Sequence, residues 1–366
     1  MLSIVGFKSK SLSRHCYRIF LLIAIVLISS SAAQAWDHPS HMITAAIAFD
    51  EIEEERPELI DKIGLIFTKH VDPAAFWVAA GDTRGKERAR LMFIEGARWP
   101  DDNKWTIHDR PTWHTARWAI VADDAPSEVE GAAEARQGRP SGQALNALVL
   151  NYAILSSTES NPTERAVALS WLLHLVGDIH QPLHVSDQFS ERFPNGNGAG
   201  TQEYVDDPLQ DSAMPLHMLW DSNSLRSTKP EAIDRNAQEF VKEYPRSAYP
   251  ELASDNKKAD FEGWARESYQ AAVDFAYGYG IETVKDPDAS SDPDKAVRKM
   301  ALYVLEGISP LESAPEVPEE YWDKLQQIAK RRITLAGYRI ADCILAAADQ
   351  IAAEQAFSGQ VLETVD

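Results

Sequence analysis

Helical spacing of apolar residues is the feature that most constrains how this chain of 366 residues can fold. The segment 161–184, NPTERAVALSWLLHLVGDIHQPLH, is apolar over a wide face at this spacing. It opens on Asn161 and Pro162, which suit a helix cap and a first turn, and it stops near Pro182, whose ring breaks a helix. Segments with the same spacing are 41–55, 142–158, 258–280, 295–308 and 319–355.

These segments predict an all-α fold, in which a single mostly helical domain carries long loops. We expect Ser40 to cap the helix over 41–55, and we expect the long final helix to break near Gly337. Strand-like sequence is scarce. The segment 196–205, GNGAGTQEYV, is where we expect either a short hairpin or a structured loop.

The N-terminus has the features of a secretory signal peptide. Four cations and no acidic residue precede the apolar run IFLLIAIVLIS, which is shorter than the about 20 apolar residues of a membrane span. The small-residue signal Ala33-Gln34-Ala35 follows. We therefore predict a signal peptide over 1–35, a domain over 36–353 and a tail over 354–366, with secretion or a periplasmic location. An uncleaved N-terminal anchor is the alternative.

The formal net charge is −20, and removal of the four cations of the predicted signal peptide leaves −24. Nothing resembles the basic stripe of a duplex-DNA-binding protein. An acidic chain that takes an anionic substrate needs another source of positive charge, and bound metal ions can supply it. Cys16 lies in the predicted signal and Cys343 in an apolar helical stretch. We expect no intramolecular disulfide in the mature chain, and a packing role for Cys343.

Two His-x-x-x-Asp pairs are the first candidates for chemistry. His174 and Asp178 lie four residues apart on one predicted helix, and His217 and Asp221 repeat that spacing. Residues four apart share a helix face, and zinc takes both imidazole nitrogen and carboxylate oxygen. One such pair is more often a salt-bridged surface, but two pairs in one chain favour a metal site.

Three further candidates surround these pairs. His184 follows the Pro182 turn and so approaches from another backbone direction, and Asp101 and His114 lie upstream in ARWPDD and PTWHTA. Taken alone, Asp101 could be a turn or cap residue and His114 a buried polar residue.

With these motifs in order, the chain resembles the S1/P1 nuclease family of zinc-dependent single-strand nucleases. The resemblance covers at least residues 36–225 and extends to the final helix. The matching motifs are Trp36 with His41 five residues later, Trp99-Pro100-Asp101, Trp113-His114, HLVGDIHQPLH and LHMLWD.

This resemblance implies nine metal-ligand positions that hold three zinc ions. The first ion would be held by Asp101, His114, His174 and Asp178, the second by His184, His217 and Asp221, and the third by His41, Asp178 and Trp36. Trp36 would bind through its free α-amino group and carbonyl oxygen, and Asp178 would bridge the first and third ions.

The resemblance also implies the reaction. A metal-activated hydroxide, oriented by Asp178 or Asp101, would cleave single-stranded DNA and RNA to 5′-phosphate products, with 3′-nucleotidase activity as a further expectation. The alternatives are a zinc-dependent phospholipase C on the same fold, or a zinc-binding protein without catalysis. The five-residue offset from Trp36 to His41, and Asp221 where a phospholipase would have Glu, favour a nuclease. We expect a monomer with no stable membrane association after signal cleavage.

Substrate contacts are less well marked in the sequence. Lys104 is the first candidate for a phosphate contact, Arg117 the second, and Trp113 a candidate for the cleft wall, although surface cations are the default reading of Lys and Arg. The sequence departs from the family at Thr115, where many members have a base-stacking aromatic, and at Gly198-Ala199-Gly200-Thr201, where many have Gly-Gly-Asn. We expect His180 not to be a ligand.

Overall fold

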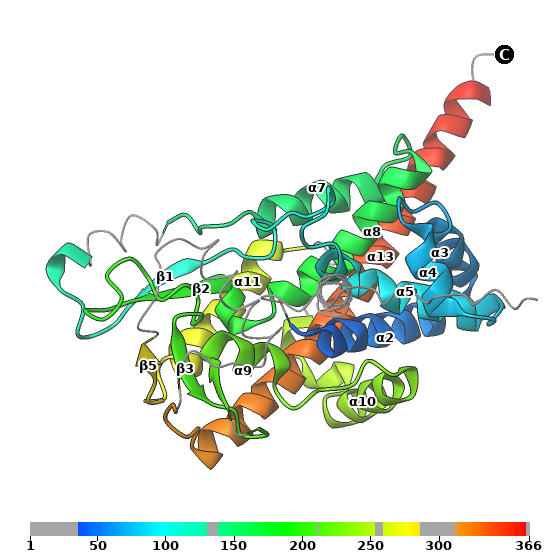
Figure 1. Ribbon diagram of the computed structural model, residues 1–366. Helices are drawn as coiled ribbons and strands as arrows, with labels where there is room; N and C mark the ends of the chain where they lie inside the picture. The colour runs from blue at the N-terminus through cyan, green and yellow to red at the C-terminus, as the bar shows by residue number, and fades with distance from the viewer. Residues whose placement is uncertain are drawn as a thin grey trace, which may run out of the picture.

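The computed structural model describes residues 36–129, 138–210, 212–252, 259–285, 311 and 313–363, with side chains through residue 356. The α-helices are α2 (His38–Glu55), α3 (Ile60–Phe67), α4 (Pro73–Ala80), α5 (Gly85–Asp102), α7 (Ala144–Ser156), α8 (Pro162–Asp178), α9 (Leu216–Ser222), α10 (Pro230–Glu243), α11 (Phe261–Ala271) and α13 (Glu319–Glu363). Short helical turns include η2 (Pro182–Val185) and η5 (Ala272–Ala276). The predicted mostly helical fold is confirmed (Figure 1).

Helix α8 lies at the centre of the domain, in contact with α2, α3, α5, α7 and α13. Its cap is the one the sequence predicts, because Asn161 Oδ1 accepts from the backbone N–H groups of Thr163 and Glu164 and Pro162 occupies the first turn. Every residue from Ala168 to Asp178 is buried. A helix surrounded by protein on all sides has no solvent face, so the His and Asp of this helix lie in the interior.

Helix α2 packs against α13, α5 and α10. Its cap differs from our expectation: the cap is Asp37, whose Oδ1 accepts from the backbone N–H and hydroxyl of Ser40. The helix starts three residues earlier than predicted because His38 and Pro39 fit a first turn, where a proline N–H is not needed.

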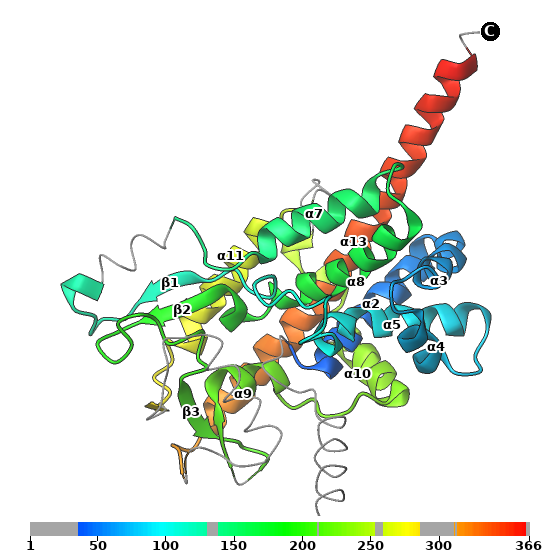
Figure 2. The same ribbon diagram turned by 45° about the horizontal axis from the view of Figure 1, so that its top comes forward.

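Helix α13 is continuous through Gly337, so the expected break is wrong. A Cβ at Gly337 would lie 2.8 Å from Ile47 Cβ and 3.0 Å from the carbonyl oxygen of Thr44. Glycine is therefore explained by close packing of α13 on α2, not by a helix end. The C-terminal part of α13 extends beyond the other helices (Figure 2).

Two small sheets flank one end of the helices. Strands β1 (Trp118–Val121) and β2 (Ser186–Phe189) pair in parallel, with Trp118 opposite Ser186. Strands β3 (Glu203–Asp206) and β4 (Ala213–Pro215) pair antiparallel, and β5 (Val284–Lys285) adds to β3. Segment 196–205 thus forms a loop that leads into a hairpin strand, as expected. The β1–β2 pair was not predicted.

The predicted signal peptide and the helix predicted over 295–308 lie outside the described residues. Within the described ranges, no helix combines the length and apolar character needed to cross a membrane.

Candidate metal centre

Six separate backbone segments bring the predicted ligands together. His174 and Asp178 lie at the end of α8, His184 on η2, His217 and Asp221 on α9, His41 on α2 and Asp101 at the end of α5, while His114 lies in the loop before β1. All eight side chains are buried, and so is Trp36. Residues that are 180 positions apart in the chain therefore share one interior site.

The first group contains Asp101, His114, His174 and Asp178. His174 Nε2 lies 3.4 Å from Asp178 Oδ2, 3.0 Å from His114 Nδ1 and 3.7 Å from Asp101 Oδ1. His114 Nδ1 lies 3.2 Å from Asp178 Oδ2. Tetrahedral zinc with ligand bonds of about 2.0–2.1 Å separates its ligand atoms by about 3.3 Å, so this group has the spacing of a zinc site.

Asp178 contacts a second set of atoms through its other oxygen. Its Oδ1 lies 3.3 Å from His41 Nε2, while Oδ2 faces His114 and His174. One carboxylate thus points its two oxygens at different histidines, as a bridging ligand does. His41 also lies near Asp101 and His174, with ligand atoms within 4.8 Å of one another and the His41 and His174 rings stacked at 3.9 Å. The predicted first and third sites are therefore contiguous.

The remaining group is formed by His184, His217 and Asp221. Asp221 Oδ1 lies 3.4 Å from His184 Nε2, and its Oδ2 lies 3.3 Å from His217 Nε2. The Nε2 amide of Gln181 donates to Asp221 Oδ1 at 2.7 Å. This carboxylate is consequently fixed in orientation by a residue that sequence reasoning had not singled out.

Backbone carbonyl groups orient three of the histidines. The Nδ1–H groups of His174, His184 and His217 donate to the carbonyl oxygens of Ala97 (2.8 Å), His114 (2.7 Å) and Ala199 (2.7 Å). A carbonyl only accepts, so each Nδ1 carries the proton and each Nε2 presents a lone pair to the centre. No sequence pattern marks these acceptors, because they are main-chain atoms of three different segments.

Several buried polar atoms of the centre have no hydrogen-bond partner among the described residues. They are both ring nitrogens of His41, Nε2 of His184, Asp101 Oδ2, Asp178 Oδ1 and Asp221 Oδ2. Buried polar groups without partners are costly and rare in native structures. Because His41 Nε2 and Asp178 Oδ1 lie 3.3 Å apart, and the other atoms belong to residues grouped at metal-ligand spacing, the set fits cations.

The electrostatics favour the same interpretation. Burial lowers the pKa values of His174 and His184 to about 4, so both rings are neutral at pH 7 and able to bind metal. Burial, together with Asp101 and Asp221, raises the pKa of Asp178 well above its usual range, and burial raises that of Asp221 to about 7. Burial alone would raise the pKa of Asp101, but Lys104 and the nearby histidines hold it below its ordinary value. The centre thus combines neutral imidazoles and an ionised Asp101 with two carboxyl groups, those of Asp178 and Asp221, that a cation would ionise.

Glycine is required where α8 meets the start of the described chain. A Cβ at Gly177 would lie 2.8 Å from His41 Nδ1 and 3.8 Å from Trp36 Cδ1. The backbone N–H of Asp37 donates to the carbonyl oxygen of Asp221 at 3.1 Å. These contacts place residues 36 and 37 against the centre.

The three predicted substrate contacts also lie around the centre. Lys104 Nζ is 2.9 Å from Asp101 Oδ1. Arg117 lowers the pKa values of His184 and His217 after larger contributions from burial, and its buried Nε has no hydrogen-bond partner among the described residues. Trp113 is half-buried, with its ring 4.8 Å from that of Trp171. Thr115 places no aromatic ring beside His114.

His180 points away from the centre, as expected: its Nδ1–H donates to the Val176 carbonyl oxygen and its Nε2 accepts from Arg339. His38, His70 and His108 also lie outside the three ligand groups.

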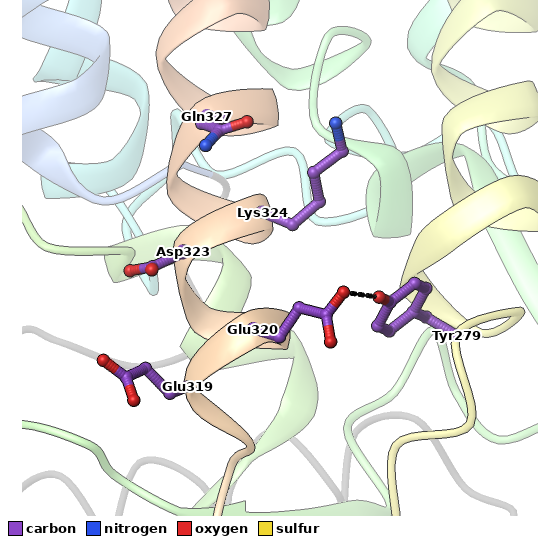
Figure 3. Close-up of a pocket in the computed structure, with 6 residues that line it drawn as sticks. All are labelled: Tyr279, Glu319, Glu320, Asp323, Lys324 and Gln327. Carbon is purple, nitrogen blue, oxygen red and sulfur yellow. Dashed lines mark hydrogen bonds between the residues drawn. The ribbon is translucent and has the colours of Figure 1, made fainter.

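An open hollow of about 520 Å³ lies elsewhere, at the start of α13 (Figure 3). Its lining includes Glu319, Glu320 and Asp323, and the Tyr279 hydroxyl donates a hydrogen bond to the Glu320 carboxylate. These carboxylates are exposed and do not converge on one point, so the hollow lacks the features of a catalytic site.

The fold and this centre define a mostly helical protein whose buried histidines and aspartates are grouped as metal ligands, a class that includes metal-dependent hydrolases. The sequence model of the S1/P1 nuclease family matches residues 36–349. The chain is 27% identical to nuclease S1 of Aspergillus oryzae over 67% of this chain and 75% of that protein. It is 22% identical to endonuclease 1 of Arabidopsis thaliana over 90% of this chain and 92% of that protein. The chain belongs to the S1/P1 nuclease family, and it is a hydrolase of phosphodiester bonds whose substrate is nucleic acid.

Proposed function

We propose that this protein is a secreted zinc-dependent endonuclease that cleaves single-stranded DNA and RNA to 5′-phosphate products, with 3′-nucleotidase activity. The observation that carries the proposal is the set of buried His and Asp ligand atoms, paired at 3.3–3.4 Å on the residues that match the family motifs, several of which have no hydrogen-bond partner among the described residues. A structural role would leave these atoms hydrogen-bonded.

We assign three zinc ions to the centre. Asp101, His114, His174 and Asp178 would hold one; His184, His217 and Asp221 a second; and Trp36, His41 and Asp178 a third. The two oxygens of Asp178 face different histidines, which supports its bridging role. When bound, zinc would acidify a water molecule and offset phosphate charge.

The chain's own residues supply orientation and charge. Lys104 keeps Asp101 ionised, so this carboxylate can accept a hydrogen bond from the attacking water. Lys104 lies beside Asp101, and Arg117 acts electrostatically on His184 and His217, so both cations would contact the phosphate oxygens. Backbone carbonyl groups hold His174, His184 and His217 in the tautomer that binds metal, so no proton has to leave these rings at neutral pH.

We propose that signal cleavage after Ala35 completes the third site. An α-amino group can bind a metal through its lone pair, whereas the amide of an uncleaved chain cannot. The family match starts at Trp36, which supports a mature N-terminus there. A secreted or periplasmic location, a domain over 36–353, a tail over 354–366 and a monomeric state complete the proposal.

The test uses purified mature protein with single-stranded and duplex DNA and RNA, with zinc or with a chelator. We expect zinc-dependent cleavage of the single strands, and zinc-independent or absent cleavage would overturn the proposal. Release of phosphocholine from lipid vesicles with nucleic acids intact would favour a phospholipase C. Bound zinc near three per chain without hydrolysis would favour a storage or binding role.

A further inference from the structure

An aromatic cavity lies beside the metal centre, between α7, the first half of α8 and the loop that joins Asp101 to His114. Its volume is about 260 Å³. The buried indoles of Trp99 and Trp171 line it, together with the partly exposed Trp113 and His108, and Leu150 of α7 lines its exposed side. We call this the aromatic cavity.

Trp171 and Trp113 link the aromatic cavity to the proposed active site. Trp171 lies one turn before His174 on α8, and its ring centroid is 5.6 Å from that of His114 and 6.2 Å from that of His174. Trp113, which immediately precedes His114, packs at 4.8 Å on Trp171. One indole thus contacts both the proposed ligands and the cavity, so a group in the cavity would lie close to a phosphate at the centre.

The loop 103–113 displays further aromatic and cationic groups beside this cavity. Trp105 is 63% exposed and has a left-handed backbone with φ of 68°, which is unfavourable for a bulky residue. Its backbone N–H donates to Asp109 Oδ2 at 2.8 Å, which holds the turn. The guanidinium of Arg110 lies 5.9 Å from the centre of the Trp113 ring. Local strain here is offset by the surrounding contacts, and it leaves the indole of Trp105 exposed to solvent on the same loop as Arg110.

We propose that the aromatic cavity binds a nucleobase of single-stranded nucleic acid, that of a nucleotide next to the cleaved phosphate. The inference rests on the proposed nuclease function. It also accounts for Thr115, because the stacking surface missing beside His114 is supplied by Trp113 and the cavity behind it.

Chemistry and size favour a base as the occupant. Aromatic side chains stack any base, and arginine adds cation–π attraction and a phosphate contact. Pockets for drug-sized ligands span about 300–1,000 Å³, so a smaller cavity suits one planar ring system. A base that leaves a duplex loses its pairing, so such a cavity favours single strands.

Leu150 provides the probe for this proposal, since it lines the cavity and is half-exposed, so we expect a polar residue there to leave the fold intact. Leu150→Glu places a charge where the base would enter. Val149→Glu is the matched control, because Val149 is the adjacent residue of α7 and is similarly exposed, at 61% against 50% for Leu150, but lines a different hollow. Trp113→Ala and Trp113→Phe test the stacking surface directly, with the phenylalanine variant expected to rescue part of the loss.

The substrates are a short oligothymidylate and its stable abasic counterpart, in which tetrahydrofuran replaces every sugar and base. We expect the wild type to prefer the base-bearing oligomer in kcat/KM by about 5- to 100-fold. Leu150→Glu and Trp113→Ala should bring this ratio towards one, mainly through KM, whereas Val149→Glu should keep it.

Equal ratios in the wild type and Leu150→Glu would overturn the proposal, and so would a loss of the ratio in Val149→Glu. If the wild type cleaves neither oligomer with zinc present, the proposed function fails instead. Base binding in the aromatic cavity is then tested by fluorescence anisotropy with labelled oligothymidylate. If the wild type binds the oligomer at least about fivefold more tightly than Leu150→Glu does, the base-binding proposal is supported. Equal affinities would refute it.

Discussion

Two buried, charged clusters lie on opposite sides of the segment 174–184. The metal centre contains His174, Asp178 and His184, whereas His180 faces an arginine cluster formed with Arg332, Arg339 and Glu267. Both clusters are almost fully shielded from water, apart from Glu267. The two clusters differ in whether their polar atoms have hydrogen-bond partners.

The arginine cluster satisfies its own hydrogen-bonding groups. Arg339 donates to Glu267 at 2.6 and 2.7 Å and to His180 Nε2 at 2.9 Å. Arg332 donates to Glu267 at 2.9 Å and to the carbonyl oxygen of His180 at 3.2 Å. None of these side chains has a buried nitrogen or oxygen without a partner among the described residues. A complete network of this kind indicates a structural role, whereas buried His and Asp atoms without hydrogen-bond partners are suited to bind a cation.

The largest expected effect comes from removing the bridging carboxylate. Asp178→Asn should lower nuclease activity at least about a hundredfold, because even the partners of metal ligands cost about 10–100-fold when removed. Burial and the neighbouring aspartates raise the pKa of Asp178, so the metal-free protein holds a neutral acid that asparagine resembles. Zinc content by mass spectrometry should fall while the metal-free Tm is retained. A large loss of metal-free Tm would contradict the distinction between the two clusters.

The second effect concerns the N-terminus. One extra alanine before Trp36 should remove most activity and lower zinc content, because the α-amino group of residue 36 becomes an amide. The control is the same extension at the C-terminus, where the described helix α13 projects from the domain. Equal zinc content and equal rates in the two extended proteins would refute the proposed third site.

The third effect tests the arginine cluster. Glu267→Gln leaves the two guanidinium groups without a counter-charge, and breaking a buried ion pair costs about 3–5 kcal/mol. Glu267 is one-third exposed, so we expect about 1–3 kcal/mol less stability in urea unfolding. Zinc content of the remaining folded protein should be unchanged. Specific zinc loss with an unaltered unfolding free energy would assign this cluster to the metal centre instead.

The fourth effect compares two tightly packed glycines. Added Cβ atoms at Gly177 and Gly337 would each lie 2.8 Å from a neighbour, His41 in the first case and Ile47 in the second. Gly177→Ala and Gly337→Ala should each destabilise the fold by about 1–3 kcal/mol through overpacking. We expect reduced zinc content and activity only for Gly177→Ala, measured against stability in the same samples. Parallel losses of activity in both variants would show that overpacking alone explains them.

The smallest effect is a proton release. The raised pKa values of Asp178 and Asp221 mean that the folded, metal-free centre holds protons that zinc must displace. Apparent zinc affinity should therefore rise between pH 6 and 8, with about one to two protons released per chain. Calorimetry in buffers of different ionisation enthalpy measures this number. A pH-independent affinity would indicate that the carboxylates are already ionised before zinc binds.

The prediction of the fold from sequence succeeded where local chemistry decides the outcome. Asn161 and Pro162 start α8 because their side chains satisfy or remove N–H groups of the first turn, independently of the rest of the protein. The wrong prediction of a helix break at Gly337 has the opposite origin, because glycine is needed there for close packing against Ile47 of another helix. Likewise, Asp37 and not Ser40 caps α2, although the two side chains bond to each other.

The sequence by itself determined the helical class and the ordered His and Asp motifs, since helical spacing and residue type are properties of short segments. It also distinguished His180 from the ligand candidates around it, because a residue two positions after Asp178 does not share the helix face of His174 and Asp178. Only the tertiary structure decided which atoms meet. It brings the carbonyl groups of Ala97, His114 and Ala199 to the three histidines, and it places different histidines beside the two oxygens of Asp178. It also forms the aromatic cavity that Trp113 lines. These features depend on long-range packing of separate elements, and main-chain atoms and cavities leave no pattern in the order of residues.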